Sequence, residues 1–161
     1  MDPVSFQIRP AVREDSATIF QLIRAIADYE KMSGEVEGNA AQVEKTLFDE
    51  KQAECLIAEE NGVPVGFALY FFNYSTFKTK HGLYLEDLFV YPQHRKKGYG
   101  KALLMELCRI AKQKHCGRME WSCLDWNEPS IQFYKSLGAR PMSEWTVYRL
   151  GEDQIQEYGS R

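Results

Sequence analysis

A short basic segment with two glycines is the first part of the sequence that suggests chemistry. It reads Gln93-His94-Arg95-Lys96-Lys97-Gly98-Tyr99-Gly100-Lys101 and leads into an amphipathic segment, Gly100 to Lys114. Glycines let backbone N–H groups turn toward a ligand, and the start of a helix carries a partial positive charge. Together with the surrounding cations, these features predict a site for a phosphate or pyrophosphate. A solvated basic turn is the alternative interpretation.

Single positions exclude two other kinds of phosphate-binding loop. A P-loop requires glycine where Arg95 stands and serine or threonine where Ala102 stands. A dinucleotide fingerprint requires a third glycine where Leu103 stands, and its strand opens the fold instead of following a hairpin. The pattern Arg-x-x-Gly-x-Gly, after a mid-chain strand and before a helix, remains.

Two adjacent acids, Glu86 and Asp87, interrupt the otherwise apolar segment Leu83 to Tyr91. Because neighbours in a strand point to opposite faces, at least one acid is expected to face the core or a cavity. A buried carboxylate without a partner is costly, so a functional role is indicated: attracting an ammonium ion and accepting its proton. The alternative is an ion pair with Arg118 or Arg149, or an edge position with both acids exposed.

Tyr134 is a further candidate for chemistry. It lies one helical turn after Ile131 in a short expected helix, Pro129 to Leu137, and is predicted to face the sheet with its hydroxyl free to reach a cleft. An ordinary core tyrosine with a satisfied hydroxyl is the alternative. Asn127 is expected to cap the same helix.

The elements that must position these residues alternate along the chain. Helices are predicted after Asp15, near Ala41 to Asp49, over Gly100 to Lys114 and over Pro129 to Leu137. The predicted strands are Val4 to Arg9, Glu54 to Glu60, Val63 to Phe72, Leu83 to Tyr91, Met119 to Leu124 and Trp145 to Leu150, with Asn61-Gly62 as a hairpin turn. This order predicts an α/β domain with a mixed, mostly antiparallel central sheet and helices on both faces. A right-handed crossover makes the fourth and fifth strands parallel, and ligands favour the carboxyl ends of such strands.

Composition narrows the class of protein. The chain has 161 residues, enough for a single domain over residues 1–161, with 44% hydrophobic and 27% charged residues. A net charge of -3 argues against a nucleic acid partner, which requires a basic face. The four cysteines show no metal-ligand spacing, so no metal is expected. No signal peptide or apolar run of about 18 residues is present, so we expect a cytoplasmic protein without a membrane span.

The glycine loop resembles the acetyl-CoA pyrophosphate loop of the Gcn5-related N-acetyltransferase (GNAT) superfamily. The resemblance extends from Ile8 to the last predicted strand. Two further blocks, Tyr84 to Val90 and Asp125 to Ala139, resemble the diamine (spermidine/spermine) and thialysine acetyltransferases. Lys96 stands where the polyamine enzymes carry a glycine.

This resemblance implies a GNAT fold and assigns roles to individual residues. Glu86 accepts the proton of the amine, and Tyr134 donates a proton to the departing thiolate of CoA. The residues assigned to acetyl-CoA are Leu88, Phe89 and Val90, whose backbone also stabilises the oxyanion, then Arg95, Lys96, Lys97, Gly98, Tyr99, Gly100, Lys101, Asn127, Pro129, Ser130 and Tyr134. The residues assigned to the amine are Tyr29, Glu30, Glu86, Asp87, Glu120, Trp121, Ser122 and Glu144.

The function expected from the sequence is therefore acetyl transfer from acetyl-CoA to a small cationic amine, by direct attack in a ternary complex. A polyamine or a thialysine-like molecule is the expected acceptor, and the resemblance implies a homodimer. An amino acid, an aminoglycoside or a protein amine is the alternative acceptor. A non-catalytic sensor of acetyl-CoA is the alternative outside catalysis, but it requires neither Glu86 nor Tyr134.

Overall fold

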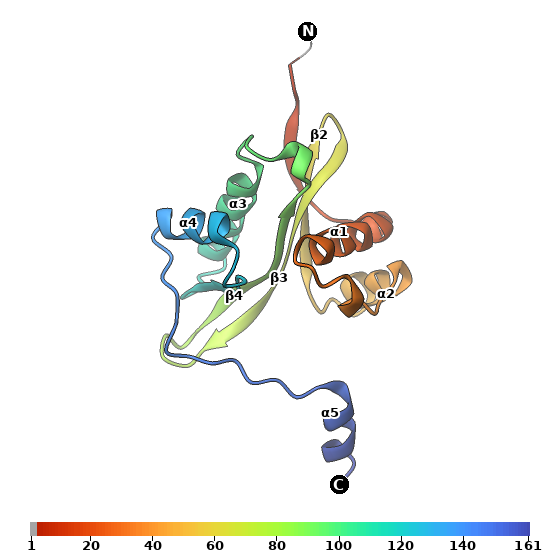
Figure 1. Cartoon of the computed structure of the whole chain (residues 1–161), viewed down its shortest axis with the longest axis vertical. Helices are drawn as coiled ribbons and strands as arrows, with labels where there is room; N and C mark the ends of the chain where they lie inside the picture. Colours follow the sequence, from red (N-terminus) through yellow and green to blue (C-terminus); the bar gives the residue numbers. More distant parts are fainter. Residues whose placement is uncertain (1–2) are drawn as a thin grey trace. The chain divides into compact units, whose positions relative to one another are not determined.

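Within residues 3–161, which the computed structural model describes, a mixed sheet of five strands is the central element (Figure 1). Its strands follow one another in chain order: β1 (Phe6–Pro10), β2 (Glu54–Glu60), β3 (Val63–Ser75), β4 (Lys80–Val90) and β5 (Met119–Trp121). Neighbours from β1 to β4 are antiparallel, whereas β4 and β5 are parallel. The predicted mixed, mostly antiparallel sheet is confirmed.

The β2–β3 hairpin turns at the two predicted residues. Asn61 and Gly62 have φ angles of 52° and 78°, and positive φ at both central positions is the mark of a type I′ turn. The turn sets Glu60 opposite Val63. It also makes Glu60 the last residue of β2, close to the segment that precedes α3.

Helices cover both faces of the sheet, as predicted. Figure 1 shows α1 (Ser16–Tyr29) and α2 (Ala40–Glu44) on one side and α3 (Tyr99–Gln113) on the other. Helix α1 buries Ile19, Leu22 and Ile26 in a core shared with side chains of β2, β3 and β4. Helix α3 buries its apolar face, Leu103, Leu104, Leu107 and Ala111. The short helical turns are η1 (Arg13–Asp15), η2 (Ser33–Glu35), the π-helical η3 (Lys45–Asp49) and η4 (Pro92–His94).

The chain divides into two compact units, of which the first ends at Ser122 and the second runs from Cys123 to Arg161. The second unit contains α4 (Glu128–Ser136) and α5 (Glu152–Gly159). The single domain expected over residues 1–161 stays a prediction. Among the described residues, no helix combines the length and the apolar composition that a membrane span requires.

The predicted strand from Trp145 to Leu150 is wrong. This segment has no regular structure, and the side chains of Trp145, Val147 and Tyr148 are 71%, 81% and 92% exposed. Its apolar composition is that of a strand, but a strand also requires a neighbour with which to exchange backbone hydrogen bonds. Within the described residues, no strand pairs with it.

Candidate active site

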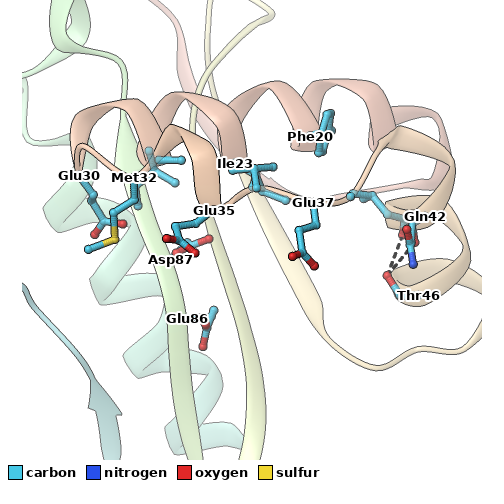
Figure 2. A pocket seen from close by; sticks show the side chains of 15 residues that line it. Phe20, Ile23, Glu30, Met32, Glu35, Glu37, Gln42, Thr46, Glu86 and Asp87 are labelled. Atoms are coloured by element: carbon cyan, nitrogen blue, oxygen red, sulfur yellow. Dashed lines mark hydrogen bonds between the residues drawn. The ribbon is translucent and has the colours of Figure 1, made fainter. Parts of the chain in front are cut away.

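A cavity of about 450 Å³ lies on the α1 side of the sheet, between α1, the segment that follows it and β4 (Figure 2). Five carboxylates line it: Glu30, Glu35, Glu37, Glu86 and Asp87. Its apolar lining includes Phe20, Ile23 and Met32. Among the described residues, none of the side chains that line it is basic. The electrostatic character of the cavity therefore favours a cation.

A β-bulge explains why Glu86 and Asp87 both line this cavity. In the pairing of β3 with β4, Leu69 lies opposite Asp87 and Tyr70 lies opposite Leu85, so Glu86 is an extra residue in β4. An extra residue interrupts the alternation of a strand and re-aims the side chains beside it. The two neighbours, which regular alternation would separate, thus share one cavity.

Burial distinguishes the two acids. Glu86 is exposed, whereas Asp87 is half-buried. Burial, followed by the nearby charges of Glu86 and Glu30, raises the pKa of Asp87 to about 6. Burial and the charge of Glu86 also raise the pKa of Glu30. Asp87 is therefore able to accept and release a proton close to neutral pH.

One of the alternative structural roles of the acids, besides an exposed edge position, was an ion pair with Arg118 or Arg149. In the structure, Nε of Arg118 lies 3.2 Å from Oε1 of Glu120, one residue away from Trp121 in β5. Arg149 belongs to the second unit. The guanidinium of Arg118 is thus engaged by a different carboxylate.

The glycine loop has the predicted arrangement between β4 and α3. Gly98 stands at the N-cap of α3 with a φ of 82°, and a side chain at Gly98 or Gly100 would meet nothing within 4 Å. The N–H of Ala102 donates to the carbonyl of Gly98 at 3.0 Å, so the three preceding N–H groups lie outside the hydrogen-bond ladder of the helix. Such N–H groups at an open helix start form a site for an anion.

Two of the loop cations make contacts within the protein. The guanidinium of Arg95 lies 4.6 Å from the ring centre of Tyr29 and 5.3 Å from that of Phe89, and its Nε donates to the Val90 carbonyl at 2.9 Å. Lys97 lies 3.0 Å from a carboxylate oxygen of Glu60. Lys96 and Lys101 are exposed. Arg95 therefore links the loop to the end of α1, next to Glu30.

The carboxyl end of β4 is open on one side. Leu88, Phe89 and Val90 pair with β3, but the pairing of β4 with β5 ends at Leu85 and Trp121. Beyond that point, within the described residues, β4 has no strand beside it on the β5 side. Backbone groups at such an edge are available to a ligand, as the oxyanion role assigned to this segment requires.

The structure gathers only part of the predicted amine site. Glu30, Glu86 and Asp87 line the cavity, whereas Tyr29, Glu120, Trp121 and Ser122 do not. The hydroxyl groups of Ser122 and Tyr84 lie 3.1 Å apart, and Tyr29 packs on Phe89. Glu35 and Glu37 were missed by the sequence analysis. Their signal was two acids in a polar stretch between Gly34 and Gly38, which resembles an ordinary exposed loop.

The other predicted residues lie in the second unit. Asn127 caps α4, as predicted, because its side-chain oxygen accepts from the N–H of Ser130 at 3.4 Å; Pro129 lies in the first turn. The ring centres of Tyr134 and Phe133 are 5.5 Å apart. Glu144 is exposed in the segment between α4 and α5.

Comparisons with known proteins agree with these features. The model of the acetyltransferase (GNAT) family matches residues 18–139. Thialysine N-epsilon-acetyltransferase of Bos taurus is 33% identical over 166 residues, which cover 96% of this chain and 97% of the relative. Spermidine/spermine N(1)-acetyltransferase-like protein 1 of Homo sapiens is 35% identical, over 93% of this chain and 23% of the relative. An integron cassette protein from V. cholerae has a similar structure, with a TM-score of 0.81, 24% identity and coverage of 98% and 99%.

Proposed function

The chain belongs to the acetyltransferase (GNAT) family, and on this premise we propose that it transfers acetyl from acetyl-CoA to a primary amine of a small cationic molecule. The observation that carries the proposal is the cavity lined by five carboxylates and, among the described residues, by no basic side chain. A polyamine or a thialysine-like molecule fits this cavity best, because such acceptors carry several ammonium groups.

The chemistry requires the cavity to bind a cation and then remove its proton. An alkylammonium ion has a pKa of about 10.4 and is not nucleophilic while protonated. We propose that Glu30 and Glu86 attract the ammonium ion and that Asp87 accepts its proton, directly or through water. The resemblance assigns this step to Glu86; we assign it to the neighbouring Asp87, because burial raises the pKa of its carboxyl to about 6.

Acetyl-CoA is proposed to bind along the open edge of β4 and at the start of α3. The N–H groups of residues 99–101 receive the pyrophosphate, and the backbone of residues 88–90 stabilises the oxyanion. The roles of Tyr134 as general acid and of Asn127, Pro129 and Ser130 as cofactor contacts rest on the family resemblance. The same holds for Tyr29, Glu120, Trp121, Ser122 and Glu144 at the amine.

A panel assay tests the proposal. Release of CoA is followed for the wild-type protein and the Asp87→Asn variant with polyamines, thialysine, lysine, neutral amino acids and aminoglycosides. We expect turnover of acceptors with more than one ammonium group, and a large loss in the variant. If the enzyme acetylated only acceptors with a single ammonium group, the proposed preference for acceptors with several ammonium groups would be refuted. Binding of acetyl-CoA without turnover of any amine would favour a sensor.

We also propose that two copies of the chain associate. The support is the exposed apolar segment between α4 and α5, where the side chains of Trp145, Val147 and Tyr148 are in contact with solvent in the single chain. Exposed apolar patches mark surfaces that bind another protein, and a second copy of the same chain is one such partner. Light scattering should give the mass of a dimer for the wild-type chain and of a monomer for Val147→Asp. A monomeric wild-type chain would refute this arrangement.

A further inference from the structure

The carboxylate of Glu60, at the end of β2, is bound by three side chains of the segment that leads into α3. The hydroxyl of Tyr99 donates to its Oε2 at 2.6 Å, and Nζ of Lys97 donates to the same oxygen at 3.0 Å. Nδ1 of His94 lies 3.3 Å from that oxygen. The Glu60 side chain is only 12% exposed. A single carboxylate of β2 therefore contacts both ends of the segment 94–99.

This segment lacks the hydrogen bonds of a helix or strand between η4 and α3. Lys96 has a φ of 65° and Gly98 a φ of 82°. The left-handed conformation is unfavourable for Lys96, which has a Cβ, so contacts outside the segment must hold it. Tyr99 supplies a second anchor, because its ring stacks on Phe6 of β1 with a centre-to-centre distance of 4.0 Å.

On electrostatic grounds alone, an acid such as Glu60 would not be expected next to the proposed phosphate site. The hydrogen bonds from Tyr99 and Lys97 lower the pKa of Glu60 to about 2, so it is ionised at any working pH. A carboxylate close to a phosphate site repels the ligand and engages Lys97, which would otherwise be available to it. The three contacts indicate that Glu60 compensates for this cost by ordering the loop.

We infer that Glu60 is a positioning residue for acetyl-CoA: by binding His94, Lys97 and Tyr99, it holds the N–H groups at the start of α3 in the arrangement that receives the pyrophosphate. This inference rests on the proposed binding of acetyl-CoA at the glycine loop. Loss of the Glu60 contacts should change the affinity for acetyl-CoA. It should not change the acidic cavity, which lies on the α1 side of the sheet.

The test is calorimetry with acetyl-CoA, together with steady-state kinetics. Glu60→Ala is expected to weaken acetyl-CoA binding about tenfold, with kcat at saturating acetyl-CoA and KM for the amine changed less than twofold. Glu60→Gln should lie between, because its amide oxygen still accepts from Tyr99. The matched control is Glu59→Ala: Glu59 is adjacent and 13% exposed but binds Arg9 at 3.2 Å, so its loss should leave affinity within twofold.

The measured affinities distinguish a positioning role of Glu60 from its other possible roles. Unchanged or tighter binding by Glu60→Ala would overturn the inference, because Glu60 would then only compete with the phosphates for Lys97. If Glu60→Ala does not fold, Tyr99→Phe replaces it: it removes the 2.6 Å hydrogen bond, keeps the ring on Phe6 and should weaken binding about fivefold. Unchanged affinity there would also overturn the inference. No binding of acetyl-CoA by the wild-type protein would refute the proposed function itself, and the inference with it.

Discussion

Replacing Asp87 by asparagine should make the fold more stable at pH 8 and the enzyme much less active. Asparagine keeps the shape of the side chain but cannot ionise. Burial beside Glu86 and Glu30 raises the pKa of Asp87 from 3.8 to about 6, so the folded chain holds this proton more tightly than the unfolded chain does. Stability of the wild-type protein is therefore lost as the pH rises from 3.8 through 6.

The structure sets the size of this effect. Each pH unit between 3.8 and about 6 corresponds to about 1.4 kcal/mol, so the charged carboxylate destabilises the fold by about 3 kcal/mol at pH 8. Asp87 retains some contact with water, and we expect Asp87→Asn to gain about 1–3 kcal/mol at pH 8. Near pH 4, where the folded wild-type protein is protonated at Asp87, the gain should nearly vanish.

The assay is urea denaturation of both proteins at pH 4 and pH 8. Glu86→Gln is the matched control, because it removes a charge from the same cavity at an exposed position and should shift stability less. Kinetics complete the test: wild-type kcat/KM for the amine should rise as Asp87 ionises near pH 6, and Asp87→Asn should lower it about 10²–10⁴-fold. A variant that is less stable than the wild type at pH 8, or equally stabilised at both pH values, would refute the reasoning.

Three further changes test the other parts of the site. Gly98→Asp places a side chain and a negative charge at a φ of 82°, so acetyl-CoA affinity by calorimetry should fall more than tenfold, whereas Gly159→Asp in α5 should not change it. Tyr134→Phe should keep that affinity and lower kcat about 10²–10⁴-fold; turnover within twofold between pH 7 and 9 would make Tyr134 a packing residue. Glu86→Gln should raise KM for the amine, lower kcat less than Asp87→Asn does, and leave acetyl-CoA binding unchanged. An effect on thermal stability alone would leave Glu86 a purely structural acid.

Features set by neighbouring residues were predictable from the sequence. Asn61-Gly62 requires positive φ at two successive positions, which defines a hairpin turn without any other part of the chain. The spacing of Leu103, Leu104 and Leu107 fixes the buried face of α3. The glycine loop follows the same rule only in part: its helix start depends on Gly98 and the residues next to it, whereas the contacts to Glu60 come from a distant strand.

Features that depend on residues far apart in the sequence could not be predicted from the sequence. The alternation of a strand separates Glu86 from Asp87, but the bulge that unites them depends on the register with Leu69 and Tyr70 of β3. Likewise, the segment from Trp145 has the composition of a strand, and whether it forms one depends on a neighbour, which composition does not show. The contribution of Glu35 and Glu37 depends on the tertiary fold, which brings η2 and the residues after it to the same cavity as Glu86 and Asp87 of β4.

The sequence order of the strands has a consequence for folding during synthesis. Strands β1 to β4 are each hydrogen-bonded to the next along the chain, and every residue that lines the acidic cavity lies between Phe20 and Asp87. Contacts between segments close in sequence form fast, and a growing chain folds from its N-terminal side. The part of the chain that holds the acidic cavity is thus able to fold on the ribosome before α3 has left the exit tunnel, and the loop proposed to bind acetyl-CoA joins it afterwards.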